Sequence, residues 1–391
     1  MRTSIAGRVL FNSGDALDYP LITVEDGTVA AIQQLTAAEY AQASKSQDFP
    51  DAVIVPAYVD IHMHGCAGSD VMEATPEAVS TVSRYLGRHG VGAYLPTTVT
   101  ASSDNTVRAL SGLCREIKRS SRDQSHVGAK PLGIHLEGPF LSSAKRGVHR
   151  ADLLRAPSVE AFERYWQASE GRIVLMTIAP EIPGALETIA YAASLGVRCS
   201  LGHSNATVAE ARAGKQAGAH SATHTFNAMR ALDHRDPGLA AYVLDDDDLF
   251  AELIADGFHV DPLMVRLYFK AKGADRVVLV TDSMSATGMP DGKYMLGEME
   301  VDVLEGRCTS GGAIAGSVLT LDRAVQNFAQ FTGAGLAVAA TAASSNPAKL
   351  IGQDAAWGRL EPGRPADFVV LSPSGEVIET FLNGVPQIGQ A

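Results

Sequence analysis

Two histidines separated by one residue follow the first long apolar run of the chain. The run covers residues 52–59 and leads into residues 60–64, where His62 and His64 flank Met63. Because residues two apart in a β-strand share a face, the two imidazoles are expected to point the same way at the end of a buried strand. Such a pair can serve one metal ion, and two structural histidines are an equally good interpretation of the pair alone.

Later apolar runs also end in side chains that bind metals. They close with His135 and Glu137, with His203, with His224 and with Asp282. Imidazoles and carboxylates at strand ends are what a hydrolytic zinc-type site requires, provided that one coordination position stays open for water. The pattern therefore predicts a metal centre built from residues that are far apart in the sequence.

Strand-like and helix-like segments alternate through the middle of the chain. Strands are predicted at residues 58–64, 93–98, 132–137, 173–178, 197–201, 221–224, 249–254 and 277–281. Helices are predicted at residues 76–88, 104–120, 159–169, 184–194, 208–217 and 262–272, whereas residues 238–248 show no clear helical pattern. Repeated βα units of this number predict an α/β fold, a (β/α)8 TIM-type barrel, whose active site lies at the C-terminal ends of its strands.

Both ends of the chain differ from this middle part. Short strands separated by turns are predicted at residues 4–10, 21–24, 29–33, 366–371 and 377–382, with one helical segment near residues 37–43. Similar ends around a different middle suggest one small β-sandwich domain that both termini build. We therefore expect residues 1–55 and 353–391 to form the small domain and residues 56–352 to form the barrel.

Composition limits the classes of partner. The chain has 391 residues, 32 basic and 44 acidic, which gives a formal net charge of −12. A negative surface disfavours polyanions, so we expect no nucleic-acid or membrane partner, although a local pocket can still bind a small phosphorylated substrate. The first residues lack the apolar core of a signal peptide, and no apolar run is long enough to span a bilayer. Four scattered cysteines without a Cys-x-x-Cys spacing indicate a reduced, cytoplasmic protein.

Five further segments match one known family in its order. They are residues 133–140 (GIHLEGPF), 201–206 (LGHSNA), 223–229 (THTFNAM), 255–261 (ADGFHVD) and 279–282 (LVTD). Together they resemble the N-acetylglucosamine-6-phosphate deacetylases of the amidohydrolase superfamily, and the resemblance runs over nearly the whole chain. The sequence departs from the usual family pattern at Ala57-Tyr58, Thr225 and Ser283, none of which removes a ligand.

The resemblance implies a set of metal ligands. In the family, the residues that match Glu137, His203 and His224 hold the principal metal ion. Family members that lack the His-x-His pair bind a single metal. Because this chain carries the pair, we expect two divalent metal ions, with Glu137 shared and with His62, His64 and Asp282 completing the second site. Zinc suits these ligands best, and iron, cobalt or manganese are alternatives. His135 is interpreted as a packed histidine behind the ligands.

Two residues are expected to carry the chemistry. Asp282, at the end of the last predicted barrel strand, can accept a proton from the attacking water and later give it to the departing amine. A bound metal lowers the pKa of water from 15.7 to about 7, which makes this transfer feasible at neutral pH. An N-cap role is the structural alternative for Asp282. The resemblance implies that His259 polarises the amide carbonyl, and such a donor typically contributes about 3 to 4 kcal/mol.

The resemblance also implies substrate contacts. The matching positions are Val148, His149, Asn227, Ala228, Asp256, Gly257, Phe258, His259, Ile314, Ala315 and Gly316. Arg235 matches a family arginine that reaches into the pocket of the neighbouring subunit, so a homodimer is expected. Residues 283–297 follow Asp282 directly, and we expect either a loop that closes over the substrate or a disordered connector.

The function expected from these features is metal-dependent hydrolysis of N-acetyl-D-glucosamine 6-phosphate to D-glucosamine 6-phosphate and acetate, in amino-sugar catabolism. An N-acetylgalactosamine-6-phosphate deacetylase and a non-catalytic sugar-phosphate-binding barrel are the alternatives. A ring-opening cyclic amidohydrolase is disfavoured, because no lysine is placed to be carboxylated as a bridging ligand and Glu137 fills that position.

Overall fold

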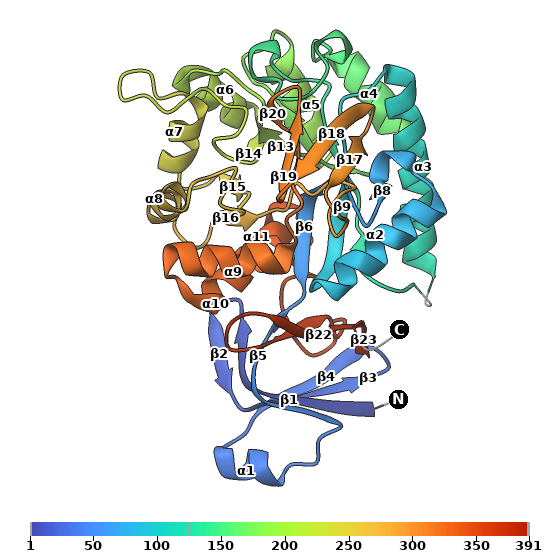
Figure 1. The fold of residues 1–391 in the computed structure, drawn as a ribbon, viewed down its shortest axis with the longest axis vertical. Helices are drawn as coiled ribbons and strands as arrows, with labels where there is room; N and C mark the ends of the chain where they lie inside the picture. The colour runs from blue at the N-terminus through green and yellow to red at the C-terminus, as the bar shows by residue number, and fades with distance from the viewer. Residues whose placement is uncertain (1, 124–125, 389–391) are drawn as a thin grey trace.

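The structure consists of a barrel and a smaller sheet that packs against one end of it (Figure 1). It is a computed structural model that describes residues 2–123 and 126–388. The barrel strands are β6 (Tyr58–Met63), β9 (Val91–Thr98), β11 (Ile134–Glu137), β12 (Ile173–Ile178), β13 (Arg198–Leu201), β14 (Ala219–Ala222), β15 (Phe250–Leu253) and β16 (Val277–Leu279). Consecutive strands pair in parallel. The end of the last strand returns to the first through a 2.9 Å hydrogen bond from the Asp282 N–H to the His62 carbonyl. The predicted (β/α)8 barrel is confirmed.

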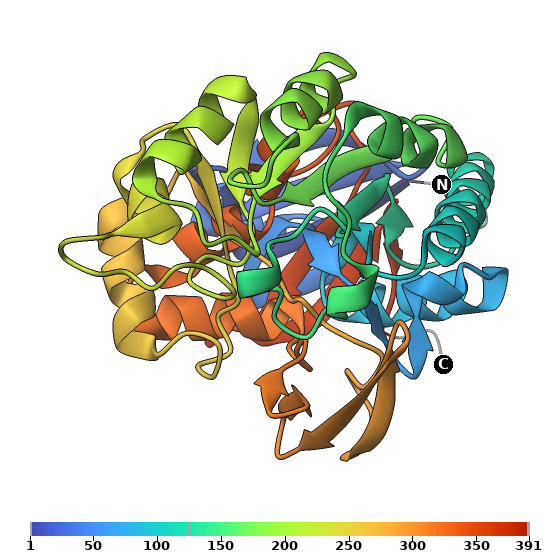
Figure 2. The ribbon, with the colours of Figure 1, turned by 90° about the horizontal axis from the view of Figure 1, so that it is seen from above.

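Helices cover the outside of the barrel, as Figure 2 shows from above. They are α2 (Pro76–Arg88), α3 (Ser103–Arg122), α4 (Val159–Ala168), α5 (Ala185–Ser194), α6 (Val208–Ala217), α7 (Gly238–Asp245), α8 (Pro262–Lys272), α9 (Leu321–Thr332), α10 (Gly335–Ala343) and α11 (Ser345–Leu350). In α2 the Thr75 side chain accepts the Ala78 N–H as N-cap, and Pro76 occupies the first helical position, as expected. None of the described helices combines the length and the apolarity needed to cross a membrane.

Four of the described helices were not expected from the sequence pattern: α9, α10 and α11, which follow the last barrel strand, and α7. The pattern predicts no helix over residues 238–248, but α7 occupies residues 238–245, so this prediction is wrong. The helix contacts α6 and α8 on its sides and β15 beneath it. Because several of its faces are covered, its residues are mostly apolar or small, and the alternation of polar and apolar positions that marks a surface helix is weak.

Both termini contribute to the smaller sheet, as expected. Its strands are β1 (Arg2–Asn12), β2 (Asp15–Asp18), β3 (Pro20–Glu25), β4 (Thr28–Gln34), β5 (Gln47–Pro56), β21 (Phe368–Leu371), β22 (Val377–Leu382) and β23 (Val385–Pro386), and α1 (Ala37–Gln42) joins β4 to β5. The long strand β5 links the two halves, since it pairs in parallel with β1 and antiparallel with β21. Apolar side chains such as Ile22, Phe368 and Phe381 form the hydrophobic core of the smaller sheet, which is separate from the core of the barrel. Residues 1 and 389–391 of the predicted small domain lie outside the described residues.

A buried carboxylate in this sheet gives a pH-dependent prediction. Asp367 precedes β21, is 8% exposed and accepts the backbone N–H of Asn383 at 2.5 Å. Burial raises the pKa of Asp367 to about 6, and the hydrogen bond from Asn383 opposes this only in part. Because the folded state then binds the proton more tightly than the unfolded state, the contribution of Asp367 to stability is lost as the pH rises through about 6.

Replacement of this carboxyl group should therefore stabilise the protein only at higher pH. Asp367→Asn keeps an acceptor oxygen for Asn383 but cannot ionise. We expect the free energy of unfolding to rise by about 1–3 kcal/mol at pH 8 and to change little at pH 4, because the folded variant no longer buries a charge at the higher pH. Urea unfolding at both pH values measures the difference, and an equal effect at the two values would contradict the prediction.

A four-stranded antiparallel sheet follows the last barrel strand and was not predicted. Its strands are β17 (Gly292–Leu296), β18 (Met299–Leu304), β19 (Arg307–Ser310) and β20 (Ala313–Ile314). Figure 2 shows it at one edge of the barrel, projecting to the side. The preceding residues 283–287 are nearly fully buried, so this segment is an ordered part of the barrel end rather than a disordered connector. The alternating pattern of β18 was a strand signal in the sequence.

Candidate metal centre and substrate pocket

The predicted ligands converge at the C-terminal ends of the barrel strands. His62 and His64 come from the end of β6, Glu137 from the end of β11, and the remaining three follow β13, β14 and β16: His203, His224 and Asp282. All six side chains are buried, with exposures of 9% or less. Closure of the barrel therefore brings together residues that lie far apart in the sequence.

Glu137 lies at the centre of this cluster. Its Oε1 atom is 3.3 Å from Nε2 of both His203 and His224 and 3.4 Å from Nε2 of His62. Its Oε2 atom is 3.2 Å from Nε2 of His64. The ion-pair partners of Glu137 among the described residues are all histidines, and no lysine or arginine is paired with it there.

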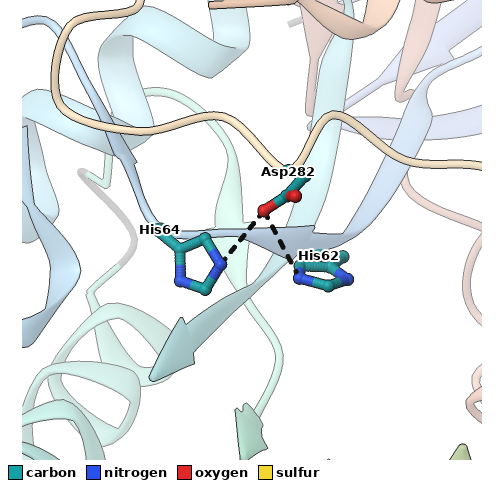
Figure 3. Close-up of side chains that lie close together, drawn as sticks. All are labelled: His62, His64 and Asp282. Carbon is teal, nitrogen blue, oxygen red and sulfur yellow. Dashed lines mark ion pairs between the residues drawn. The ribbon is translucent and has the colours of Figure 1, made fainter. Parts of the chain in front are cut away.

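A second carboxylate faces the His-x-His pair (Figure 3). The Oδ1 atom of Asp282 lies 3.1 Å from Nε2 of His64 and 3.6 Å from Nε2 of His62. These three side chains form one group that could hold a metal ion, and Glu137, His149 and His203 form another. The sequence predicts His149 as a sugar contact, and in the structure its Nε2 also lies 3.8 Å from Glu137.

The donor atoms fit a divalent metal. Nε2 of His62 and Oε1 of Glu137 are buried and have no hydrogen-bond partner. Nε2 of His203 and Nε2 of His224 lie only 3.0 Å apart, so two ring nitrogens converge on one point. Neighbouring ligands of a tetrahedral site with bonds of roughly 2.0–2.1 Å are about 3.3 Å apart, close to the spacings in this cluster.

The backbone at three candidate ligands is strained. His203, His224 and Asp282 have φ angles of +46°, +28° and +50°, in the left-handed region that these residue types rarely adopt. Such a conformation costs about 1–3 kcal/mol and occurs mainly at functional sites. In each case it turns the chain directly after a barrel strand. Asp282 does not cap a helix, since the next described helix, α9, begins at Leu321.

Electrostatics favour ionised carboxylates in the cluster. Burial alone would lower the pKa of His64, but hydrogen bonds to Asp282 and Glu137 raise it to about 9. Burial would likewise raise the pKa of both carboxylates, but the neighbouring imidazoles hold the pKa of Glu137 and that of Asp282 below their usual values. These imidazole protons would have to leave when a divalent cation binds, because only a neutral imidazole is a metal ligand, and the charged carboxylates would then face free ring nitrogens.

Other groups orient the candidate ligands from behind. The Nδ1 of His64 faces the Thr97 carbonyl oxygen at 3.0 Å, and the Nδ1 of His62 faces Oε2 of Glu252 at 3.1 Å. His135 is fully buried, with its Nε2 2.8 Å from Oγ1 of Thr177, in agreement with a packed histidine. Glu252 was not among the residues predicted from the sequence. An acidic residue inside the apolar run of residues 249–255 was the available signal.

A cavity of about 270 Å³ opens beside the cluster. The predicted substrate residues that line it are Val148, His149, Asn227, Ala228, His259, Ile314 and Gly316, together with the ligand candidates His64, Glu137, His203, His224 and Asp282. A second cavity of about 270 Å³ shares His259, Ile314 and Gly316 and adds Asp256, Gly257 and Phe258. Ala315 is fully buried, and Arg235 lies in an exposed loop; neither is among the residues that line these two cavities.

Asp256 fixes the ring of His259. Its Oδ2 is 2.6 Å from Nδ1 of His259, while its Oδ1 accepts the backbone N–H groups of Phe258 and His259, each at 2.8 Å. Burial would lower the pKa of His259, but the hydrogen bond to Asp256 raises it. Asp256 therefore fixes the imidazole as a hydrogen-bond donor at the wall of the cavity. A donor in a fixed position is what is needed to polarise a carbonyl group.

A parallel barrel with buried histidines and carboxylates at the strand ends defines a class of hydrolases. The sequence profile described as the amidohydrolase family matches residues 53–386, and the chain belongs to this family. It is therefore a hydrolase that acts on amide bonds.

Within this family the chain is similar to deacetylases of amino-sugar phosphates. It is 37% identical over 380 residues to the N-acetylglucosamine-6-phosphate deacetylase of Vibrio furnissii, covering 97% of this chain and 93% of that protein. It is 36% identical over 380 residues to the N-acetylgalactosamine-6-phosphate deacetylase of Escherichia coli O157:H7, covering 97% of both. A mutant N-acetyl-D-glucosamine-6-phosphate deacetylase of Mycobacterium smegmatis, solved in complex with N-acetyl-D-glucosamine-6-phosphate, aligns with a TM-score of 0.92 and 32% identity over 99% of both chains. The resemblance seen in the sequence is confirmed.

Proposed function

We propose that this protein hydrolyses N-acetyl-D-glucosamine 6-phosphate to D-glucosamine 6-phosphate and acetate, in amino-sugar catabolism. The main observation behind this proposal is that Glu137, Asp282 and His259 line the same cavity as the clustered histidines. The similarity to deacetylases over nearly the full length supports this choice of substrate.

The proposed centre holds two divalent metal ions, with zinc as the first choice and iron, cobalt or manganese as alternatives. Its ligands are His62, His64, Glu137, His203, His224 and Asp282. When bound, a divalent metal supplies a Lewis acid that polarises the amide carbonyl and makes water more acidic. The two donor groups and the shared position of Glu137 support a dinuclear arrangement.

The protein's own side chains supply the proton transfers and the orientation. Asp282 takes a proton from the attacking water and returns it to the amine nitrogen as the C–N bond breaks. His259, held by Asp256, donates a hydrogen bond to the carbonyl oxygen as negative charge develops there. The substrate-binding role proposed for the other cavity residues is to place the acetamide group between these two side chains.

The sugar phosphate requires a cation that the described chain does not place in the main cavity. Among the described residues, those lining that cavity include no lysine or arginine. Arg235 lies in the exposed loop between β14 and α7, at the rim of the barrel. We propose that the active unit is a homodimer in which Arg235 reaches the phosphate in the partner's pocket; the exposed apolar side chain of Leu232 in the same loop supports an interface there.

A second candidate substrate is N-acetyl-D-galactosamine 6-phosphate. The similarity to the E. coli O157:H7 enzyme, at 36% identity and 97% coverage of both chains, favours this candidate specifically. The two sugars differ only in the configuration of the hydroxyl group at C4. The rates with the two substrates, measured under the same conditions, decide between them.

Two further proposals concern the context of the enzyme. The four cysteines are all free and buried, which supports a reducing compartment such as the cytoplasm. As domain limits, we propose residues 1–55 and 353–391 for the small domain and residues 56–352 for the barrel.

The test of the function is acetate release from N-acetyl-D-glucosamine 6-phosphate. We expect turnover that a chelator abolishes and a divalent metal restores, with about two metal ions per chain in the active sample. The galactosamine substrate and the unphosphorylated sugar serve as controls. A metal-replete protein that binds these sugar phosphates but releases no acetate would instead be a non-catalytic binding protein.

A further inference from the structure

Glu252 is a fully buried carboxylate to which the proposed reaction gives no role. It lies on β15 between Ala251 and Leu253, and none of its surface is exposed. A buried carboxylate is costly unless it is paired. Its Oε2 atom has two partners, the Nδ1 of His62 at 3.1 Å and the backbone N–H of His224 at 3.2 Å. Both partners belong to proposed metal ligands.

The contact determines which ring nitrogen of His62 carries the proton. When the His62 ring is neutral, as a metal ligand must be, a hydrogen bond from Nδ1–H to Glu252 leaves the lone pair on Nε2. This Nε2 atom is buried without a hydrogen-bond partner, 3.4 Å from Glu137 and 3.6 Å from Asp282. Glu252 thus directs the lone pair of His62 toward the other donor atoms.

The remaining ligands are oriented differently. Backbone carbonyl oxygens of Thr97 and Lys145 face the Nδ1 atoms of His64 and His203, each at 3.0 Å. The Nδ1 of His224 has no partner, and its position depends on a strained backbone with φ of +28°, whose N–H donates to Glu252. Within the part of the chain that the structure describes, Glu252 is the carboxylate that contacts His62 and His224 together.

We propose that Glu252 is a positioning residue for the two-metal centre: through its contact with Nδ1 of His62 it holds this ring with Nε2 toward the other ligands, and so sets the affinity for the second metal ion. This inference rests on the two-metal centre proposed above. A carboxylate behind a metal-binding histidine also makes that histidine a stronger ligand.

Metal titration of the full chain tests the proposal without any substrate. The variants are Glu252→Gln, which keeps an acceptor oxygen without the charge, and Glu252→Leu, which removes the acceptor. Zinc binding to the metal-free proteins is measured by competition with a chelating dye, and metal content by elemental analysis. Glu116→Gln is the matched control, because Glu116 is a 7% exposed glutamate on α3 whose Oε2 accepts from Arg119.

The expected result is graded and specific to one site. The wild type and Glu116→Gln bind two zinc ions with the same affinities. The second-site affinity falls about tenfold in Glu252→Gln and about 100-fold in Glu252→Leu, the range seen when groups behind metal ligands are removed. In Glu252→Gln, which keeps an acceptor oxygen for the His224 N–H, the first-site affinity changes by less than about threefold, which a general disturbance of the fold would not allow.

Two results would overturn the proposal. Unchanged second-site affinity in both Glu252 variants would show that His62 is oriented without Glu252, and an equal loss at both sites would show a merely structural role. If Glu252→Leu does not fold, Glu252→Gln decides alone. A wild-type chain that binds fewer than two ions would refute the two-metal centre itself, and this inference with it, whereas acetate release is tested separately.

Discussion

Asp282→Asn is expected to lower kcat by about 10²–10⁴-fold, the range that a general acid–base group contributes. Asparagine is nearly isosteric and keeps an oxygen where Oδ1 lies 3.1 Å from Nε2 of His64, so the cluster should remain assembled. It cannot take a proton from the attacking water or return one to the amine. Substrate affinity, measured by calorimetry on the slow variant, should change by less than about tenfold.

Metal content and a remote variant make this test specific. Asp302→Asn is the control, because Asp302 is an exposed aspartate on β18 whose side chain is 64% accessible. Asp302→Asn should contain as much metal as the wild type, and the metal content of Asp282→Asn should stay largely intact, because Glu137, His62 and His64 still contact one another around the second site. If Asp282→Asn retained full turnover with full metal content, Asp282 would not be the proton-transfer group. If it lost metal in proportion to activity, its role would be that of a ligand only.

Glu137→Gln is expected to remove both metal ions and to reduce turnover to background. Glu137 lies within 3.4 Å of four imidazole nitrogens, those of His62, His64, His203 and His224. It therefore contacts the histidines of both proposed metal sites. An amide is a weak ligand and carries no charge, so the loss in affinity should exceed the 10–100-fold expected for a group behind the ligands. Elemental analysis after gel filtration measures the metal content.

The fold of this variant must be shown to be intact. Glu116→Gln again provides a matched change of a buried glutamate elsewhere, and circular dichroism should show the same helix content for both variants. Excess zinc should restore turnover only in part, because the shared ligand is still missing. A Glu137→Gln protein that keeps two metal ions per chain would exclude Glu137 as the shared ligand.

The sequence by itself determined the architecture and the types of residue in the site. Alternating apolar segments of strand and helix length predicted the barrel because each segment must bury one face locally, and this does not depend on distant residues. His62, Glu137, His203 and Asp282 each follow such a segment, so their placement at one end of the barrel followed from chain direction alone. Helix α7 was missed, since neighbouring helices cover it and its polar periodicity is weak.

Only the tertiary structure decided which side chains touch. Glu252 contacts His62 across 190 positions of sequence, and no local pattern specifies that pair. The same holds for His149, which lies beside Glu137 as well as in the substrate cavity, and for Arg235, which is not among the residues that line the two cavities of its own chain. The physical reason is that periodicity fixes which face of a segment is buried, whereas distances between polar groups inside a barrel depend on how all eight strands close together.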